Sequence, residues 1–168
     1  MRFLTIVRHC EATPGDDDVA RTLTSRGRSQ AEWLRQSALA TDGLGQFGPT
    51  TCLLSAAART RETYALAFAG TPFVRSLERS ELIYNGNRHV SGLDLLASLA
   101  EIDPVTESLC VIAHNPSVLE LVHELTESVP DEFIDNFPVG SAYVVEIPSD
   151  TPIGLGRYRV AATFCPPA

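Results

Sequence analysis

Short apolar runs rich in β-branched residues alternate with amphipathic segments along most of the chain, and few folds accommodate such a pattern. The apolar runs at residues 3–7, 51–54 and 109–113 have the length and composition of buried strands. Segments with a helical spacing of apolar residues lie between and after them, at residues 27–39, 57–69, 91–100 and 117–125. The repeated order of strand and helix predicts a layered α/β/α domain with a mostly parallel central sheet.

Three further extended segments complete the expected sheet. A short strand is expected near Phe73 and Val74, and two late runs, residues 142–147 and 158–163, can form a hairpin. The chain has 168 residues and contains no internal repeat, low-complexity tract or linker. Because domains usually contain about 100–150 residues, we expect one domain that spans residues 1–168.

All 13 basic residues are arginines, and the chain contains no lysine. A Schiff-base lysine and the lysine of a P-loop are therefore excluded. With 21 acidic residues the net charge is -8, and a domain of that charge lacks the positive field that attracts nucleic acid. Arginine is suited to a bidentate grip on phosphate, so the positions of the arginines matter more than their number.

Neither the cysteines nor the acidic residues form a metal-binding pattern. The four cysteines are far apart with no CxxC pair, and we expect Cys52 and Cys110 to be reduced core residues. The acidic run at residues 16–18 lies in a glycine-containing loop without a second carboxylate group, so we interpret it as solvated. We therefore expect no metal and no cofactor.

The sequence carries no sign of a membrane or export signal. The amino terminus begins directly with a strand-like segment and lacks the apolar stretch of a signal peptide. No stretch reaches the roughly 18 apolar residues of a transmembrane helix. We therefore expect a cytoplasmic protein with no membrane partner.

Polar residues of interest follow three of the expected strands. Arg8 and His9 follow the first, Arg59 comes shortly after the second, and His114 follows the third apolar run. Ligands bind at the carboxyl edge of open α/β sheets, so these side chains should converge there. The helix after His114, with Asn115 as its cap, would add the positive end of its dipole. Each residue alone is commonly structural, but together they predict a phosphate site in which one histidine can attack phosphorus.

Four segments of the chain resemble the motifs of one protein family. Residues 4–12 (LTIVRHCEA) resemble the opening Arg-His-Gly motif of the histidine phosphatase superfamily, the phosphoglycerate mutase-like group. Three later segments are similar to further motifs of that family in the same order: residues 23–31, 55–63 and 111–116. The resemblance spans residues 3–147 and implies a phosphoglycerate mutase-like α/β fold.

The resemblance also implies a reaction and a set of roles. The chain resembles the SixA-like phosphohistidine phosphatase branch in three features: its short length, Arg21, and residues 137–141 before a late strand. His9 would be the nucleophile that forms a phosphohistidine intermediate, which water then hydrolyses. The phosphoryl oxygens would be held by Arg8, Arg59 and His114. Arg21 would be a further contact at the rim.

Several positions depart from the family pattern. Ala56 replaces the usual proline and Thr60 the usual alanine, and we expect these two changes to alter packing only. Cys10 replaces the motif glycine beside the nucleophile, where it can crowd the backbone or require a conformation that glycine adopts more easily. Its thiol could have a lowered pKa beside two arginines, or it could simply fill space. The general acid of many relatives has no clean match here, and Glu81 is the candidate for that role, with an ordinary surface charge as the alternative.

The connection between Arg59 and His114 is short, which suggests an open pocket. Such a pocket suits a phosphohistidine on a protein surface, so we predict a phosphohydrolase whose partner is a phosphorylated protein. One alternative is a phosphatase of a small phosphate ester with the same His9 chemistry. A second alternative is a non-catalytic phosphate-binding module in which Cys10 has disabled the nucleophile. The oligomeric state is not indicated by the sequence.

Overall fold

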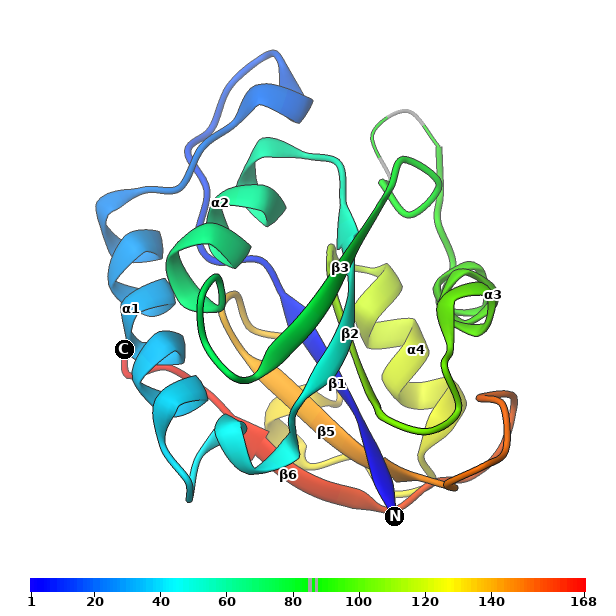
Figure 1. The fold of residues 1–168 in the computed structure, drawn as a ribbon. Helices are drawn as coiled ribbons and strands as arrows, with labels where there is room; N and C mark the ends of the chain where they lie inside the picture. The colour runs from blue at the N-terminus through cyan, green and yellow to red at the C-terminus, as the bar shows by residue number, and fades with distance from the viewer. Residues whose placement is uncertain (85, 87) are drawn as a thin grey trace.

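A computed structural model describes residues 1–84, 86 and 88–168. Its centre is a six-stranded sheet with the strand order β3-β2-β4-β1-β5-β6 (Figure 1). The strands are β1 (Arg2–Arg8), β2 (Thr50–Ser55), β3 (Val74–Ser80), β4 (Ser108–Ala113), β5 (Ala142–Ile147) and β6 (Val160–Phe164). The pairs β1–β4, β2–β4 and β2–β3 are parallel, whereas β5 runs antiparallel to both β1 and β6. The sheet is therefore mostly parallel, as predicted.

Helices cover both faces of this sheet (Figure 1). On one face lie α1 (Ser25–Leu39) and α2 (Ala58–Ala67), and on the other lie α3 (Gly92–Ile102) and α4 (Ser117–Leu125). Three short 3-10 helices occupy loops: η1 (Asp18–Ala20), η2 (Leu44–Phe47) and η3 (Asp131–Phe133). The predicted α/β/α layering is confirmed. Among the helices of the described residues, none is both long and apolar enough to cross a membrane.

The central strands are apolar along their whole length because both faces of the sheet are covered. Along β4, Leu109 and Val111 pack toward α3 and α4, while Cys110 and Ile112 pack toward α1 and α2. All four side chains are fully buried. Continuous apolar runs are typical of such doubly covered strands.

Three segments differ from the expectations. The third strand, β3, extends to Ser80, well beyond the short piece expected near Phe73. It is an edge strand with many exposed side chains, so its sequence lacks the apolar run by which the other strands were recognised. The last strand begins at Val160, two residues later than expected. Asn115 does not cap α4: Pro116 occupies the cap position after a cis peptide bond, and no side chain caps this helix.

The first turn of α1 packs against the backbone next to β1, and we expect Gly27 to be essential for this contact. A Cβ atom on Gly27 would lie 2.0 Å from the carbonyl oxygen of Glu11. Gly27→Ala should therefore destabilise the fold by about 1–3 kcal/mol, the usual cost of overpacking. Urea unfolding would measure this effect. Gly154→Ala is the matched control, because its Cβ would meet nothing within 4 Å, and an equal loss in both variants would contradict the prediction.

Candidate active site

The sheet brings the two predicted histidines together at its carboxyl edge. β1 and β4 are parallel neighbours with Arg8 beside Ala113, so the residue after each strand is a histidine at the same level. The backbone N–H of His9 donates to the carbonyl of Ala113 over 3.1 Å. The ring centroids of His9 and His114 are 5.2 Å apart.

The imidazole of His9 is held in one tautomer. Its Nδ1 lies 2.7 Å from the carbonyl oxygen of Cys10, and because a carbonyl only accepts, Nδ1 carries the hydrogen. The basic nitrogen is therefore Nε2. Burial is the main cause that lowers the pKa of His9 to about 3; the positive charges of Arg59, Arg8 and Arg21 act in the same direction, and the bond to Cys10 opposes the shift. The ring is neutral near pH 7 and keeps a lone pair available for attack.

His114 is the more deeply buried of the two histidines, with 2% of its surface exposed. Its Nε2 lies 2.7 Å from Oγ of Ser55, the last residue of β2. Burial, followed by the neighbouring His9 and Arg59, lowers the pKa of His114 to about 2. Its Nδ1 is buried and makes no hydrogen bond with any residue that the structure describes.

Two neutral buried histidines predict a loss of stability in mild acid. In the unfolded chain their pKa returns to about 6.5, so below that pH the unfolded chain binds protons that the folded chain does not. The free energy of unfolding should therefore fall as the pH drops from about 6.5 toward 3, by at most about 1.4 kcal/mol per pH unit for each histidine. Urea unfolding at several pH values would measure the slope. His9→Ala should make it shallower, and an unchanged slope would contradict the assignment.

Arg8 and Arg59 accompany the histidines and are only partly engaged by the protein. Nη1 of Arg8 donates to the carbonyl of Phe137 over 2.8 Å, and Nη1 of Arg59 donates to the carbonyl of Asp18 over 2.8 Å. The Nε atom of each guanidinium is buried and makes no hydrogen bond within the described residues. Burial, with Arg59 as the second cause, lowers the pKa of Arg8.

These side chains line one pocket of about 240 Å³. Five predicted site residues surround it: Arg8, His9, Arg21, Arg59 and His114. Glu11, Ala12, Asn115 and Val139 complete its lining. The carboxylate of Glu11 is already engaged, since it accepts from Thr24 over 2.9 Å and pairs with Arg26 over 3.3 Å.

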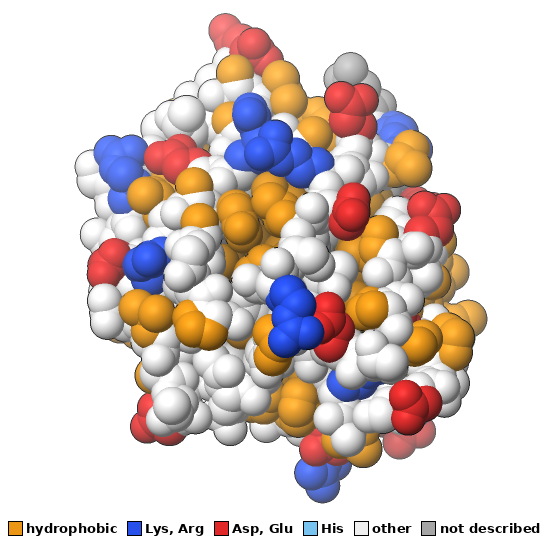
Figure 2. All heavy atoms as spheres, in the orientation of Figure 1, with side chains coloured by type: hydrophobic (Ala, Val, Ile, Leu, Met, Phe, Trp, Pro, Cys, Tyr) orange, Lys and Arg blue, Asp and Glu red, His pale blue; other side chains and the backbone are white. Residues whose placement is uncertain are grey.

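Glu81, the candidate general acid, does not line this pocket. It is exposed and lines a separate shallow pocket with Arg61 and Arg79. Figure 2 shows basic side chains gathered on the surface over the start of α2 and the end of β3. The placement of Glu81 in the structure therefore gives no support to an acid role.

Cys10 is accommodated without strain. Its backbone is not in the left-handed region, and its N–H donates to Oγ1 of Thr63 over 3.0 Å. The side chain is fully buried in the apolar cluster that includes Val7 and Leu34. Burial raises the pKa of its thiol to about 12. Of the two readings of Cys10, the space-filling one is supported, and an activated thiol is not.

The sequence did not reveal two residues next to the pocket, Asp18 and Tyr84. The interpretation of residues 16–18 as a solvated loop did not include the pairing of Asp18, whose half-exposed carboxylate binds both Arg21 and Arg59. Tyr84 lies edge-on to His114, with ring centroids 5.7 Å apart. The three-residue spacing from Asp18 to Arg21 was the one available signal.

Among the described residues, no group of three His, Cys, Asp or Glu side chains is arranged to bind a metal ion.

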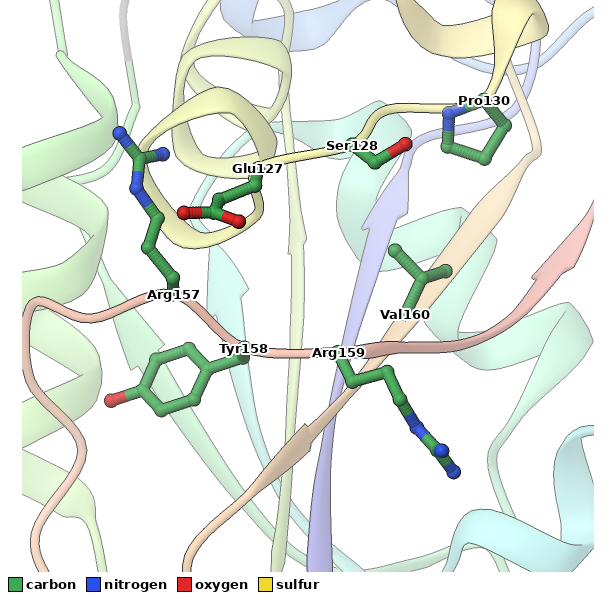
Figure 3. Close-up of a pocket in the computed structure, with 7 residues that line it drawn as sticks. All are labelled: Glu127, Ser128, Pro130, Arg157, Tyr158, Arg159 and Val160. Carbon is green, nitrogen blue, oxygen red and sulfur yellow. The ribbon is translucent and has the colours of Figure 1, made fainter.

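A larger hollow of about 530 Å³ lies at the other end of α4, away from His114 (Figure 3). Its arginines are already in use, since Arg157 donates to the carbonyls of His123 and Thr126 at the end of α4, and Arg159 pairs with Glu146. No unpaired buried polar side chain of the described residues lines it. We therefore place the functional site at the smaller pocket.

Comparisons with known proteins agree with the fold. No protein-family model and no curated protein matches the sequence. A structure assigned as the phosphohistidine phosphatase SixA from Nakamurella multipartitia is 21% identical, with 99% of this chain and 97% of that chain covered and a TM-score of 0.79. The protein histidine phosphatase SixA complexed with tungstate is 23% identical, with 96% and 95% covered and a TM-score of 0.68. A mycobacterial glucosyl-3-phosphoglycerate phosphatase is 15% identical, with 95% and 97% covered and a TM-score of 0.63.

The chain therefore has the fold of the phosphoglycerate mutase-like histidine phosphatases. The resemblance that the four sequence motifs indicated is confirmed at the level of the fold. The solved structures are similar over nearly their whole length as well as that of this chain.

Proposed function

We propose that this protein is a phosphohydrolase with His9 as its nucleophile. One observation carries the proposal: three buried N–H donors or ring nitrogens, Nε of Arg8, Nε of Arg59 and Nδ1 of His114, have no partner among the described residues. All three belong to side chains that line one pocket with His9. Buried polar groups are rarely left unpaired, and a tetrahedral anion would supply acceptors to all three.

The reaction then has two displacement steps. The lone pair on Nε2 of His9 forms a bond to phosphorus while the bond from phosphorus to the leaving group breaks, and the leaving group departs with that electron pair and takes up a proton. A water oxygen next forms a bond to phosphorus, the bond to Nε2 breaks and the water's proton is lost, which releases phosphate. Arg8, Arg59 and His114 stabilise the charge on the phosphoryl oxygens in both steps.

A phosphohistidine on another protein is the substrate that fits best. At about 240 Å³ the pocket is smaller than the roughly 300–1,000 Å³ of sites that enclose small molecules. It has room for a phosphoryl group with little beyond it. Glu11 is the carboxylate in its lining, and both of its oxygens are bonded elsewhere. An imidazole leaving group is readily protonated and needs little help from an acid of the protein.

A phosphatase of a small phosphate ester is the second candidate. The glucosyl-3-phosphoglycerate phosphatase named above shares the fold, so the fold alone is compatible with either substrate class. The same His9 chemistry would serve both.

Phosphate release from two kinds of substrate distinguishes these candidates. A histidine-phosphorylated phosphotransfer protein and a panel of sugar, glycerate and nucleotide phosphates would be compared at matched concentrations. We expect the phosphoprotein to have the highest kcat/KM. A strong preference for one small ester would overturn the phosphohistidine assignment. Phosphate binding without release from any substrate, including an aryl phosphate, would leave only a binding module.

A further inference from the structure

The carboxylate of Asp18 joins two of the arginines that line the pocket, Arg21 and Arg59. Its Oδ1 accepts from Nε of Arg21 over 3.1 Å, and its Oδ2 accepts from Nη2 of Arg59 over 3.2 Å. The carbonyl of the same residue accepts from Nη1 of Arg59 over 2.8 Å. Each terminal nitrogen of Arg59 therefore makes one hydrogen bond with Asp18, whereas its buried Nε makes none with the described residues.

Asp18 does this from outside the pocket. Arg21 and Arg59 line the pocket, whereas Asp18 does not. The carboxylate therefore engages the two guanidinium groups without being part of the pocket lining. An arginine side chain has many rotamers, so a buried guanidinium that is fixed in advance loses less freedom when an anion binds.

A second contact connects Asp18 to the histidine side of the site. The hydroxyl of Tyr84 donates to Oδ2 of Asp18 over 2.5 Å. The ring of Tyr84 packs edge-on against His114, and Cζ of Arg59 lies 5.8 Å from its centroid. Asp18 thus contacts Arg21 at the rim, Arg59 beside the histidines, and Tyr84, which packs against His114.

We propose that Asp18 is a positioning residue that fixes the guanidinium of Arg59, with Arg21 at the rim, in the orientation needed for phosphoryl transfer. This inference rests on the proposed phosphohydrolase function. Asp18 acts through Arg59 and does not contact the reacting atoms. Loss of its carboxylate should therefore impair the chemical step more than the binding of phosphate.

A role as proton donor would require a protonated carboxyl, and the surroundings of Asp18 oppose it. The hydrogen bond from Tyr84 lowers the pKa of Asp18 most, and Arg59 and Arg21 lower it further against a smaller opposing effect of burial. The group is ionised near neutral pH. Ionisation is the state in which it pairs with the two arginines.

Asp18→Asn and Asp16→Asn form a matched pair for testing this proposal. Both remove one negative charge from the same loop, but Asp16 is exposed and makes no side-chain hydrogen bond or ion pair with the described residues. We expect Asp18→Asn to lower kcat about 10- to 100-fold while the inhibition constant of inorganic phosphate changes less than about threefold. Asp16→Asn should stay within about twofold in both. Equal effects of the two variants, or a higher kcat for Asp18→Asn, would overturn the proposal.

Two further measurements separate a role through Arg59 from a general one. In an Arg59→Ala background, Asp18→Asn should cost no more than about twofold in kcat, because its effect passes through the missing side chain. A full additional loss would overturn the proposal. In NMR spectra, the Nε–H signal of Arg59 should shift or broaden in Asp18→Asn and stay unchanged in Asp16→Asn. This signal needs no turnover, so if the wild-type protein releases no phosphate, the proposed function fails while the NMR result still decides the role of Asp18.

Discussion

His9→Ala should abolish phosphate release while the protein remains folded. Among the described residues, His114 is the other imidazole in the pocket; its Nε2 is engaged with Ser55, and its Nδ1 is the nitrogen that we assign to a phosphoryl oxygen. Without the N–P bond no covalent intermediate forms, and the remaining anion-binding groups can only orient water. We expect kcat/KM of the variant to be lower by at least about 10⁴-fold, the scale found when the nucleophile is removed from a set of catalytic residues that act together.

Quenching the reaction with acid or alkali tests the intermediate directly. Phosphohistidine is labile in acid and stable in alkali, so labelled phosphate should remain on wild-type protein after an alkaline quench and be lost after an acid quench. His9→Ala should retain no label in either. His123→Ala is the control, because His123 is exposed on α4, does not line the pocket, and donates from Nε2 to the backbone carbonyl of Ile134. Substantial turnover by His9→Ala would refute the covalent route.

The strand ends explain why most of the site could be predicted from the sequence. Arg8 ends β1, His9 follows it, and His114 follows β4, so two parallel neighbours bring both imidazoles to one edge. Arg59 lies in the first turn of α2, one turn beyond the end of β2. Each of these positions is fixed by an apolar run whose length and burial can be read locally.

The residues that were missed lie on loops, where local sequence does not determine the conformation. Asp18 belongs to η1, which has no buried residue, and it is held by contacts with Arg59 and Tyr84, which are far away in the sequence. Asn115 was expected to cap α4 from its residue type, but Pro116 occupies the cap position and the side chain of Asn115 donates to Asn136. Edge strand β3 was underestimated because its exposed charged residues hide the apolar pattern.

A buried ion pair between Arg2 and Asp103 lies at the other end of the sheet from the active site. All five N–H donors of Arg2 are used: two on the carboxylate of Asp103, over 2.6 and 2.9 Å, and the others on the carbonyls of Pro148, Glu107 and Thr151. The Arg2 and Asp103 side chains are 3% and 1% exposed. This cluster ties the start of β1 to the loops before β4 and after β5.

The carboxylate of Asp103 depends on that arginine. Burial alone would raise the pKa of Asp103, but the hydrogen bonds from Arg2 and from the backbone N–H groups of Ile153 and Val105 outweigh it and leave the pKa below its ordinary value. The pair therefore contributes stability above about pH 4, the pKa of an unfolded aspartate, and this contribution is lost as the pH falls through the lower pKa of the folded state.

Arg2→Met should consequently destabilise the protein by about 3–5 kcal/mol at pH 7, because it leaves a buried carboxylate and three carbonyls without their donor. For a chain of this size the loss corresponds to a fall in Tm of roughly 6–20 °C. Arg159→Met is the matched control: Arg159 pairs with Glu146 over 3.0 Å but is 79% exposed, so its loss should cost less than about 1 kcal/mol. Below pH 4 the difference between wild type and Arg2→Met should shrink as Asp103 becomes protonated. Arg2 and His9 lie at opposite ends of β1, so Arg2→Met should retain kcat/KM at temperatures where it is folded. Equal stability losses in Arg2→Met and Arg159→Met would show that the buried pair does not hold this end of the sheet together.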